Sequence, residues 1–408
     1  MNSSLTGNGR RNALVLSGLQ ALGGANPAVV VALGGLVGSQ LAPSTEMATL
    51  PVSLFNIGLA LGVLPAAFVM RQKGRRFGYV VGSLLGASGG MIAFYGIAIG
   101  SFLLFCLGTI LAGLYASYVQ SYRFAAADSV EGPLKPKAIS WVMIGGLVAA
   151  VLATQVILHT SEIIPSLPFG GTFIAQAILA LCALPLIAFL RNDPAVTHNT
   201  PAAHTNASHG RPLLEIIKQP KFIVAVIAGT SSYSLMSFMM TASPLAMVGC
   251  GHSMRDSTLG IQWHILAMFG PSFFTGTLIR RFGKIAVTLS GLLLIALASV
   301  VALRGLSVEH FWISLILLGL GWNFGFIGAT AMVTDCYRNE ERNRVQAFND
   351  FLVFGSVAIS SFSSGQLLVT HGWDGINTWT FPIVGVVVVS LMWLWFHERS
   401  QAADVAAD

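Results

Sequence analysis

The feature that most constrains the fold of this chain is a succession of twelve long apolar runs. Each run has roughly the 20 residues that an α-helix needs to cross the hydrocarbon core of a bilayer. Because backbone amides must be satisfied internally in lipid, runs this long predict helices and not barrel strands. The expected spans cover residues 13–37, 47–70, 77–99, 102–127, 138–159, 170–190, 222–248, 258–279, 285–303, 311–334, 345–370 and 377–396.

The composition excludes an ordinary soluble domain. Only 9% of the residues are charged and the mean hydropathy is +0.73, whereas soluble domains carry about 25% charged residues. The four cysteines show no CxxC motif and no metal-ligand spacing, so we expect neither a metal site nor a cofactor. The net charge of +6 comes from Lys and Arg between the apolar runs, which argues against nucleic-acid binding.

The basic residues predict the orientation of the chain in the bilayer. With the N-terminus placed inside, 20 of the 22 Lys and Arg residues fall on the inner side, and only Arg255 and Arg304 fall outside. Cytoplasmic loops are the ones enriched in Lys and Arg. We therefore expect a multi-pass protein of the cell inner membrane with both termini in the cytoplasm.

The second half of the chain repeats the first. Gly74 aligns with Gly283 at an offset of 209 residues, and Asp128 aligns with Asp335 at an offset of 207. Two landmarks that agree this closely indicate a duplicated six-helix unit. The polar stretch between the halves is rich in Pro, Ala, Asn and Thr, which is typical of a flexible linker. We predict an N-terminal six-helix bundle at 1–191, a cytoplasmic linker at 192–220 and a C-terminal six-helix bundle at 221–408.

On these landmarks the chain resembles the major facilitator superfamily over almost its whole length. The family loop pattern Gly-x-x-x-Asp-Arg-x-Gly-Arg-Arg is partly matched by Gly74, Arg75 and Arg76, whereas Ala67 and Arg71 replace its first Gly and its Asp. The resemblance implies an all-α membrane protein with twelve transmembrane helices in two six-helix bundles. A pseudo-two-fold axis along the membrane normal would relate the two bundles.

Charged residues at the inner ends of both halves are candidates for gating. An acid follows span 4 and another follows span 10, each near a basic loop that could pair with it. Such pairs can bias one of two conformations; the alternative is that they only help to define topology and helix ends. The predicted gating residues are Arg75, Arg76, Asp128, Lys137, Arg281, Lys284, Asp335 and Arg344.

The resemblance also directs attention to the spans that line the central cavity of the family, which are 1, 4, 7 and 10 with contributions from 2, 5, 8 and 11. Polar groups deep in such spans usually face the interior, and aromatic rings beside an amide suit a planar polar ligand. Helix packing is the alternative for the aromatic residues, and snorkelling to the interface is the alternative for Arg123. The predicted substrate-binding residues are Asn26, Tyr118, Tyr122, Arg123, Tyr233, Gln262, Trp263, Trp322 and Asn323.

Two residues are candidates for proton coupling. Asp350 is the only acid more than one helical turn inside an apolar run, and His264 is the single His well inside a span. The proton affinity of such a group changes with its hydration. The alternatives are a neutral hydrogen-bonded role for His264 and a charge partnership of Asp350 with Arg344 or Arg123.

These observations predict a secondary transporter that moves a small organic solute by alternating access, with proton coupling as a further hypothesis. An aromatic or vitamin-like metabolite such as riboflavin suits the aromatic candidates, since bacterial riboflavin importers resemble this superfamily. One alternative is efflux of drugs or toxic compounds by proton antiport, although span 5 reads GGLVAAVLATQ where the antiporters carry a Gly-Pro step. Another is a non-transporting membrane sensor or enzyme on a transporter scaffold, but no catalytic cluster supports an enzyme. We expect a monomer in the lipid bilayer.

Overall fold

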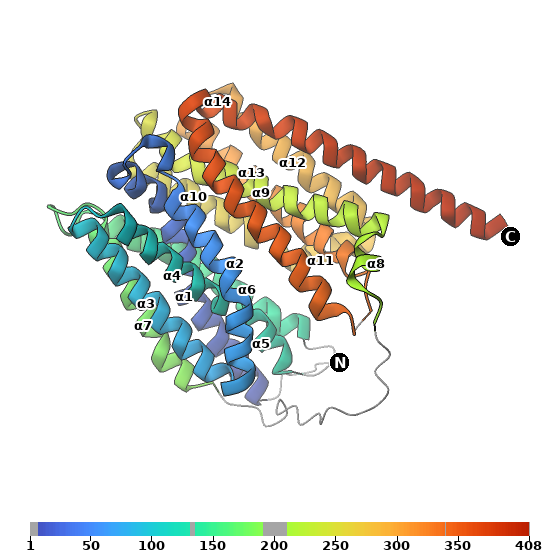
Figure 1. Cartoon of the computed structure of the whole chain (residues 1–408), viewed down its shortest axis with the longest axis horizontal. Coiled ribbons are helices and arrows are strands. Elements are labelled where there is room, and N and C mark those ends of the chain that lie inside the picture. Colours follow the sequence, from blue (N-terminus) through green and yellow to red (C-terminus); the bar gives the residue numbers. More distant parts are fainter. Residues whose placement is uncertain (1–6, 131–134, 191–209, 339, 408) are drawn as a thin grey trace.

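The computed structural model describes residues 7–130, 135–190, 210–338 and 340–407. Within these ranges the chain is helical apart from short connections, and ten helices are long and apolar enough to cross a membrane. One of the ten is α14, which contains two spans, and a further span is broken into α10 and α11. The described residues therefore contain the twelve predicted spans, which form two bundles of six (Figure 1).

The first bundle contains spans 1 to 6. Span 4 is formed by two helices, α4 and α5, that adjoin at Ser121. A short 3-10 helix, η1, connects the first two spans. The elements are α1 (Gly7–Leu41), η1 (Thr45–Met47), α2 (Leu50–Lys73), α3 (Arg75–Ala98), α4 (Phe102–Gln120), α5 (Tyr122–Asp128), α6 (Lys135–Thr160) and α7 (Gly170–Ala188).

The second bundle contains spans 7 to 12, preceded by the short helix α8. Its elements are α8 (Leu213–Ile217), α9 (Pro220–Gly249), α10 (Met254–Phe269), α11 (Ser272–Phe282), α12 (Lys284–Arg304), α13 (Val308–Val333) and α14 (Arg342–Ala407). The linker predicted at 192–220 stays a prediction, because residues 191–209 lie outside the described ranges.

Two spans of the second bundle depart from the simple expectation. The span predicted at 258–279 is interrupted between α10 and α11, because Pro271 has no backbone N–H to continue the helix. Spans 11 and 12 form one element, α14, whose two arms meet at Gly372 with φ of 67° (Figure 1). Glycine adopts this left-handed conformation without the steric cost that other residues meet.

Glycines allow the same pair of helices to pack closely in each half. Residues Gly89 and Gly108 bring α3 against α4, and Gly291 and Gly321 bring α12 against α13. A methyl group added at any of these positions would overlap backbone atoms of the neighbouring helix. Spans 3 and 4 therefore contact each other in the same way as spans 9 and 10, as expected of a repeated unit and of membrane helices that associate through small residues.

The two bundles are joined at the end of the molecule that lies away from the basic loops. Thr49, just before α2, donates a hydrogen bond to the carbonyl oxygen of Phe362 in α14 at 3.3 Å. Asn56 in α2 donates to the Ser361 hydroxyl of the same helix at 3.0 Å. Both contacts link spans 2 and 11, so this end of the space between the bundles is closed.

Candidate substrate cavity

A central cavity of about 180 Å³ lies between the two bundles. Helices α1, α2, α4, α5 and α6 line it from one side, and α9 and α10 line it from the other. Most of the lining side chains are apolar, with a few polar groups among them, as is usual for sites that bind small molecules. The polar lining residues are Gln20, Asn56, Gln120, Arg123, Tyr233, Ser237 and Thr241.

The apolar lining of the cavity is adaptable. It includes four methionines, together with Phe55 from the first bundle and Phe269 from the second. Methionine is unbranched and polarizable, so a wall of methionines can adjust to the shape of a ligand and contacts aromatic rings favourably. The methionines are Met143, Met236, Met240 and Met268.

Arg123 is the charged residue of the lining within the described part of the chain. It lies on α5, and its side chain is exposed in the cavity. The guanidinium contacts the ring of Phe124 at 4.9 Å from the centroid. It also interacts electrostatically with Asp350 on α14 and with Tyr233 on α9, at longer range than a direct ion pair. One cation therefore faces groups of the opposite bundle across the cavity.

Tyr233 reaches the cavity from a cluster of aromatic rings in the second bundle. Its ring makes edge-to-face contacts with Trp322 at 5.4 Å, with Phe326 at 5.1 Å and with Phe354 at 5.9 Å. Trp322 itself is buried and stacks on Phe326, behind the lining of the cavity. Tyr233 is thus placed to contact a ligand, and Trp322, another aromatic candidate, holds Tyr233 in position.

Three candidates from the first bundle lie away from the cavity lining. Asn26 is buried between helices, donates to the carbonyl oxygen of Ala112 at 3.0 Å and accepts from Gln176. Tyr122 is fully buried against the edge of another tyrosine ring, with the centroids 4.8 Å apart. Tyr118 is buried as well and packs against Gly82 of α3. This placement favours helix packing for all three residues, because their side chains point into their own bundle. Their role as ligand contacts stays a prediction.

The remaining candidates from the second bundle also lie outside the lining. Asn323 donates to the carbonyl oxygen of Met268 at 2.6 Å, close to the break between α10 and α11. His264 is fully buried, and its Nδ1 lies 2.7 Å from the carbonyl oxygen of Leu315. Trp263 is 42% exposed on the outside of the bundle, while Gln262 is partly buried beside it. Three consecutive residues of a helix point in different directions, so depth in the membrane alone does not identify the lining.

Each predicted gating acid forms an ion pair with a basic residue at the start of the preceding span of its own half. Asp128 at the end of α5 pairs with Arg75 at 2.5 Å, and Asp335 after α13 pairs with Lys284. Burial raises the pKa of Asp335, but hydrogen bonds from Lys284 and Lys221 outweigh it, so the pKa is lower than its ordinary value. Both pairs lie within one bundle and are partly exposed, and such pairs contribute about 0–1 kcal/mol. Their role in gating stays a prediction.

Other predicted gating residues make different contacts. Arg76 donates to the carbonyl oxygen of Ala188 at the end of α7, at 2.8 Å. Arg281 lies over the ring of Phe282, 5.3 Å from its centroid. The side chain of Lys137 lies outside the described residues.

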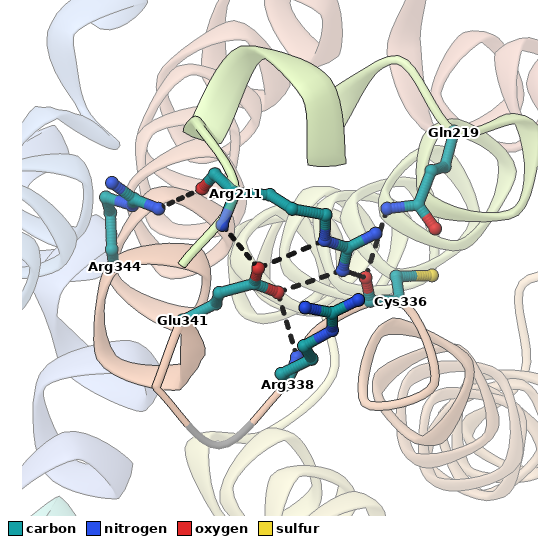
Figure 2. Close-up of polar contacts among 6 residues, drawn as sticks. All are labelled: Arg211, Gln219, Cys336, Arg338, Glu341 and Arg344. Carbon is teal, nitrogen blue, oxygen red and sulfur yellow. Dashed lines mark hydrogen bonds and ion pairs between the residues drawn. The ribbon is translucent and has the colours of Figure 1, made fainter. Parts of the chain in front are cut away.

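A network of hydrogen bonds around Glu341, drawn in Figure 2, was not predicted from the sequence. The side chain of Glu341 is fully buried in the connection between α13 and α14, and accepts from Arg211 Nε at 3.0 Å and Nη2 at 2.9 Å. The backbone amides of Arg211 and Arg338 donate to it as well. Because of these donors, with Arg211 contributing most, the pKa of Glu341 is lowered to about 2. Arg344, a gating candidate, donates to the carbonyl oxygen of Arg211 (Figure 2).

Within the described ranges, no three His, Cys, Asp or Glu side chains gather in a way that could hold a metal ion. The cavity therefore offers apolar walls, neutral amides and hydroxyls, and the single cation of Arg123. This combination suits a flat, largely uncharged organic molecule that carries hydrogen-bonding groups at its edge.

Comparison with known proteins identifies the class first. The family model of the Major Facilitator Superfamily matches residues 13–306 and 265–407, and the chain belongs to this superfamily. It is accordingly a membrane transporter and not an enzyme, as the sequence predicted. The fold resembles that of the nucleoside transporter NupG, with a TM-score of 0.70 at 13% identity over 93% of this chain and 99% of that one. The predicted all-α architecture is thereby confirmed.

Two individual transporters are similar to this chain over most of its length. The chain is 57% identical over 400 residues to the riboflavin transporter RfnT of Brucella anthropi, which covers 97% of this chain and 98% of the relative. It is also 30% identical over 370 residues to YdeG of Bacillus subtilis, an uncharacterized transporter of the superfamily, over 88% and 86% of the two chains.

Proposed function

We propose that this chain transports riboflavin, or a flavin closely similar to it, across the cell inner membrane. The observation that carries the proposal is the 57% identity to a riboflavin transporter over almost the full length of both chains. At this level of identity, relatives share their fold throughout, and the cavity described above has the chemistry that a flavin needs.

A flavin is a flat tricyclic ring with carbonyl and N–H groups along one edge and a polyhydroxylated side chain. The rings of Phe55 and Phe269 and the methionine side chains supply apolar surface for the faces of such a ring. The amide and hydroxyl groups of the lining match its edge and its side chain. Arg123 supplies a donor for a carbonyl oxygen, and the lining residues that the structure describes include no carboxylate that would repel an electron-rich edge.

The size of the cavity indicates that ligand binding widens it. Its volume of about 180 Å³ is smaller than the roughly 300–1,000 Å³ of sites that hold drug-sized ligands. The methionines are the side chains that can move at low cost, because they change rotamer without a branched Cβ. Closure around the ligand would then follow from movement of the bundles, as in alternating access.

The basic loops and the two termini are assigned to the cytoplasm in this proposal, in agreement with the charge distribution. The contacts of spans 2 and 11 then seal the cavity from the outside. Proton coupling is assigned to Asp350, because this carboxyl group interacts with Arg123, which lines the cavity. His264 lies against Leu315 inside the second bundle, and its position favours a structural role. The transporter is proposed to act as a monomer.

The test is uptake of radiolabelled riboflavin by proteoliposomes that contain the purified chain, with protein-free liposomes as the control. We expect saturable uptake that unlabelled riboflavin abolishes and that a nucleoside or a cationic drug leaves unchanged. A pH gradient should accelerate riboflavin uptake when it is imposed with one polarity, and should not accelerate uptake when the polarity is reversed. Uptake at the level of protein-free liposomes, in preparations whose riboflavin binding is also absent, would overturn the proposal.

A further inference from the structure

Four polar side chains meet where the cavity ends between spans 2, 7 and 11. They come from both bundles: one from α2, two from α9 and one from α14. Asn56 lies six residues into α2, about 9 Å from the start of that helix at helical rise, at the end away from the basic loops. We call Asn56, Ser237, Thr241 and Ser361 the polar seal.

Ser361 is the centre of the polar seal and uses its whole hydrogen-bonding capacity there. Its hydroxyl lies 3.0 Å from Asn56 Nδ2, 2.7 Å from Ser237 Oγ and 3.3 Å from Thr241 Oγ1. A serine hydroxyl has two acceptor lone pairs and one donor proton. Because Asn56 and Thr241 donate, the remaining proton of Ser361 is directed to Ser237. The side chain of Ser361 is fully buried, so its hydroxyl depends on these three partners.

The three partners of Ser361 are exposed to the cavity, and Ser361 itself is not. Asn56, Ser237 and Thr241 all line the cavity, whereas Ser361 lies behind them. A ligand in the cavity can therefore reach the same three side chains that form hydrogen bonds with Ser361. The close packing of this region is supported by Thr49, which is fully buried and bonds the backbone of α14 one residue further along.

We propose that the polar seal closes the cavity at this end, and that a neutral ligand carrying both hydrogen-bond donors and acceptors loosens it by taking over the partners of Ser361. The same three side chains then serve recognition and closure, so binding of the ligand is linked to opening of the sealed end. This inference rests on the transport function proposed above, and it assigns to the ligand an edge of amide or hydroxyl character.

The chemistry of the polar seal suits a contact that must open and close. A neutral hydrogen bond contributes little net free energy when water can replace it, so an opened seal is not penalised heavily. A buried hydroxyl that has lost its partners is disfavoured, so the closed state depends on each member. An apolar contact of similar size would instead expose apolar surface on opening.

The structure offers a matched pair of serines for the test. Ser361 and Ser364 lie on the same helix one turn apart, and both are fully buried. Ser364 donates only along its own helix, to the carbonyl oxygen of Ser361 at 2.8 Å. Ser361→Ala removes three hydrogen bonds of the seal, and Ser364→Ala removes one local bond. Ser364→Ala therefore controls for loss of a buried hydroxyl from α14.

The first readout needs no ligand. In a chain whose four native cysteines are replaced, Leu245→Cys introduces a thiol where α9 packs against Gly35 of α1. The rate at which a membrane-impermeant maleimide, added from the side of this contact, labels the thiol measures opening of the sealed end. We expect Ser361→Ala to raise this rate by at least about tenfold, since three bonds are lost, and Ser364→Ala to leave it within about twofold.

The second readout uses riboflavin as the probe and measures both its dissociation constant and its effect on labelling. Riboflavin should raise the labelling rate in the chain with an intact seal. Thr241→Val, which keeps the shape of the side chain, should weaken riboflavin binding several-fold, whereas Ser361→Ala should not weaken it. If Ser361→Ala fails to fold, Thr241→Val still tests the seal, through a smaller rise in the basal labelling rate.

Each result decides one part of the proposal. Equal labelling rates in Ser361→Ala and Ser364→Ala, with Thr241→Val also at the basal rate, would overturn the seal. Riboflavin that binds without changing the labelling rate would overturn its opening by ligand. Absence of riboflavin binding in every folded variant, together with faster labelling of Ser361→Ala, would overturn the proposed substrate and leave the seal in place.

Discussion

Replacement of Asn323 by leucine should destabilise the second bundle without changing ligand affinity. Asn323 is fully buried, and its Nδ2 donates to the carbonyl oxygen of Met268 at 2.6 Å and to Ser272 Oγ at 2.8 Å. Its Oδ1 accepts from Thr275 Oγ1 at 2.6 Å. All three partners lie on either side of the break between α10 and α11, so Asn323 holds the two pieces of span 8 in register.

The magnitude follows from the number of bonds. Side-chain hydrogen bonds inside membrane proteins contribute about 0.6 kcal/mol on average and up to about 1.7 kcal/mol. Loss of three such bonds should cost about 2 kcal/mol, with an upper bound of about 5 kcal/mol. Leucine has a similar volume, so no large cavity adds to this cost. For a unit the size of one bundle, the midpoint of thermal unfolding should fall by about 4–8 °C.

The assay is thermal unfolding of the purified chain in detergent, followed by riboflavin binding at 25 °C. Asn377→Leu is the control, because Asn377 is equally buried but donates to the carbonyl oxygen of Trp373 in its own helix, at 2.8 Å. Asn323→Leu should lower the midpoint more than Asn377→Leu does. An unchanged midpoint combined with loss of riboflavin binding would refute the structural role and restore the ligand contact predicted from the sequence.

Three further predictions concern charge, coupling and packing. The lowered pKa of Glu341, about 2 against an ordinary 4.5, means that its stabilising contribution is complete above about pH 4.5 and is lost as the pH falls toward 2. Glu341→Gln should therefore lower the thermal midpoint at neutral pH and flatten its pH dependence in that window, whereas Glu340→Gln on the exposed neighbouring residue should do neither. Asp350→Asn should abolish uphill accumulation of riboflavin but preserve downhill exchange in proteoliposomes; uphill transport in this variant would exclude Asp350 as the coupling acid. Gly291→Ala, where a methyl group would overlap the backbone of α13, should lower the thermal midpoint strongly, and Gly385→Ala, with open space around it, should not; equal midpoints would contradict the close contact of α12 and α13.

Much of the fold could be predicted because membrane spans are encoded locally. The length of each apolar run, the basic residues between the runs and the offset between the halves required no knowledge of tertiary contacts. The ion pairs of Asp128 with Arg75 and of Asp335 with Lys284 were among those anticipated, since each joins the ends of spans that a short loop brings together. The interruption of span 8 at Pro271 was not predicted, although the proline that causes it is visible in the sequence.

The lining of the cavity could be predicted only in part. Arg123 and Tyr233 line the cavity, whereas Asn26 and Asn323 satisfy their polar groups inside their own bundles and Tyr122 is buried inside its bundle. Position along a span gives the depth of a residue in the membrane and not the direction in which it points. In a soluble helix an apolar stripe marks the buried face, but here lipid and protein interior are both apolar, so that signal is missing.

By itself, the sequence determined a twelve-span transporter with duplicated halves, because spans, charges and repeats are properties of neighbouring residues. Only the tertiary structure decided which side chains meet across the bundles. Ser361 joins partners 305, 124 and 120 residues away in the chain, and Glu341 joins Arg211 at a separation of 130. Such contacts depend on how each helix is rotated about its axis and on where the bundles touch. Packing of the whole molecule sets both.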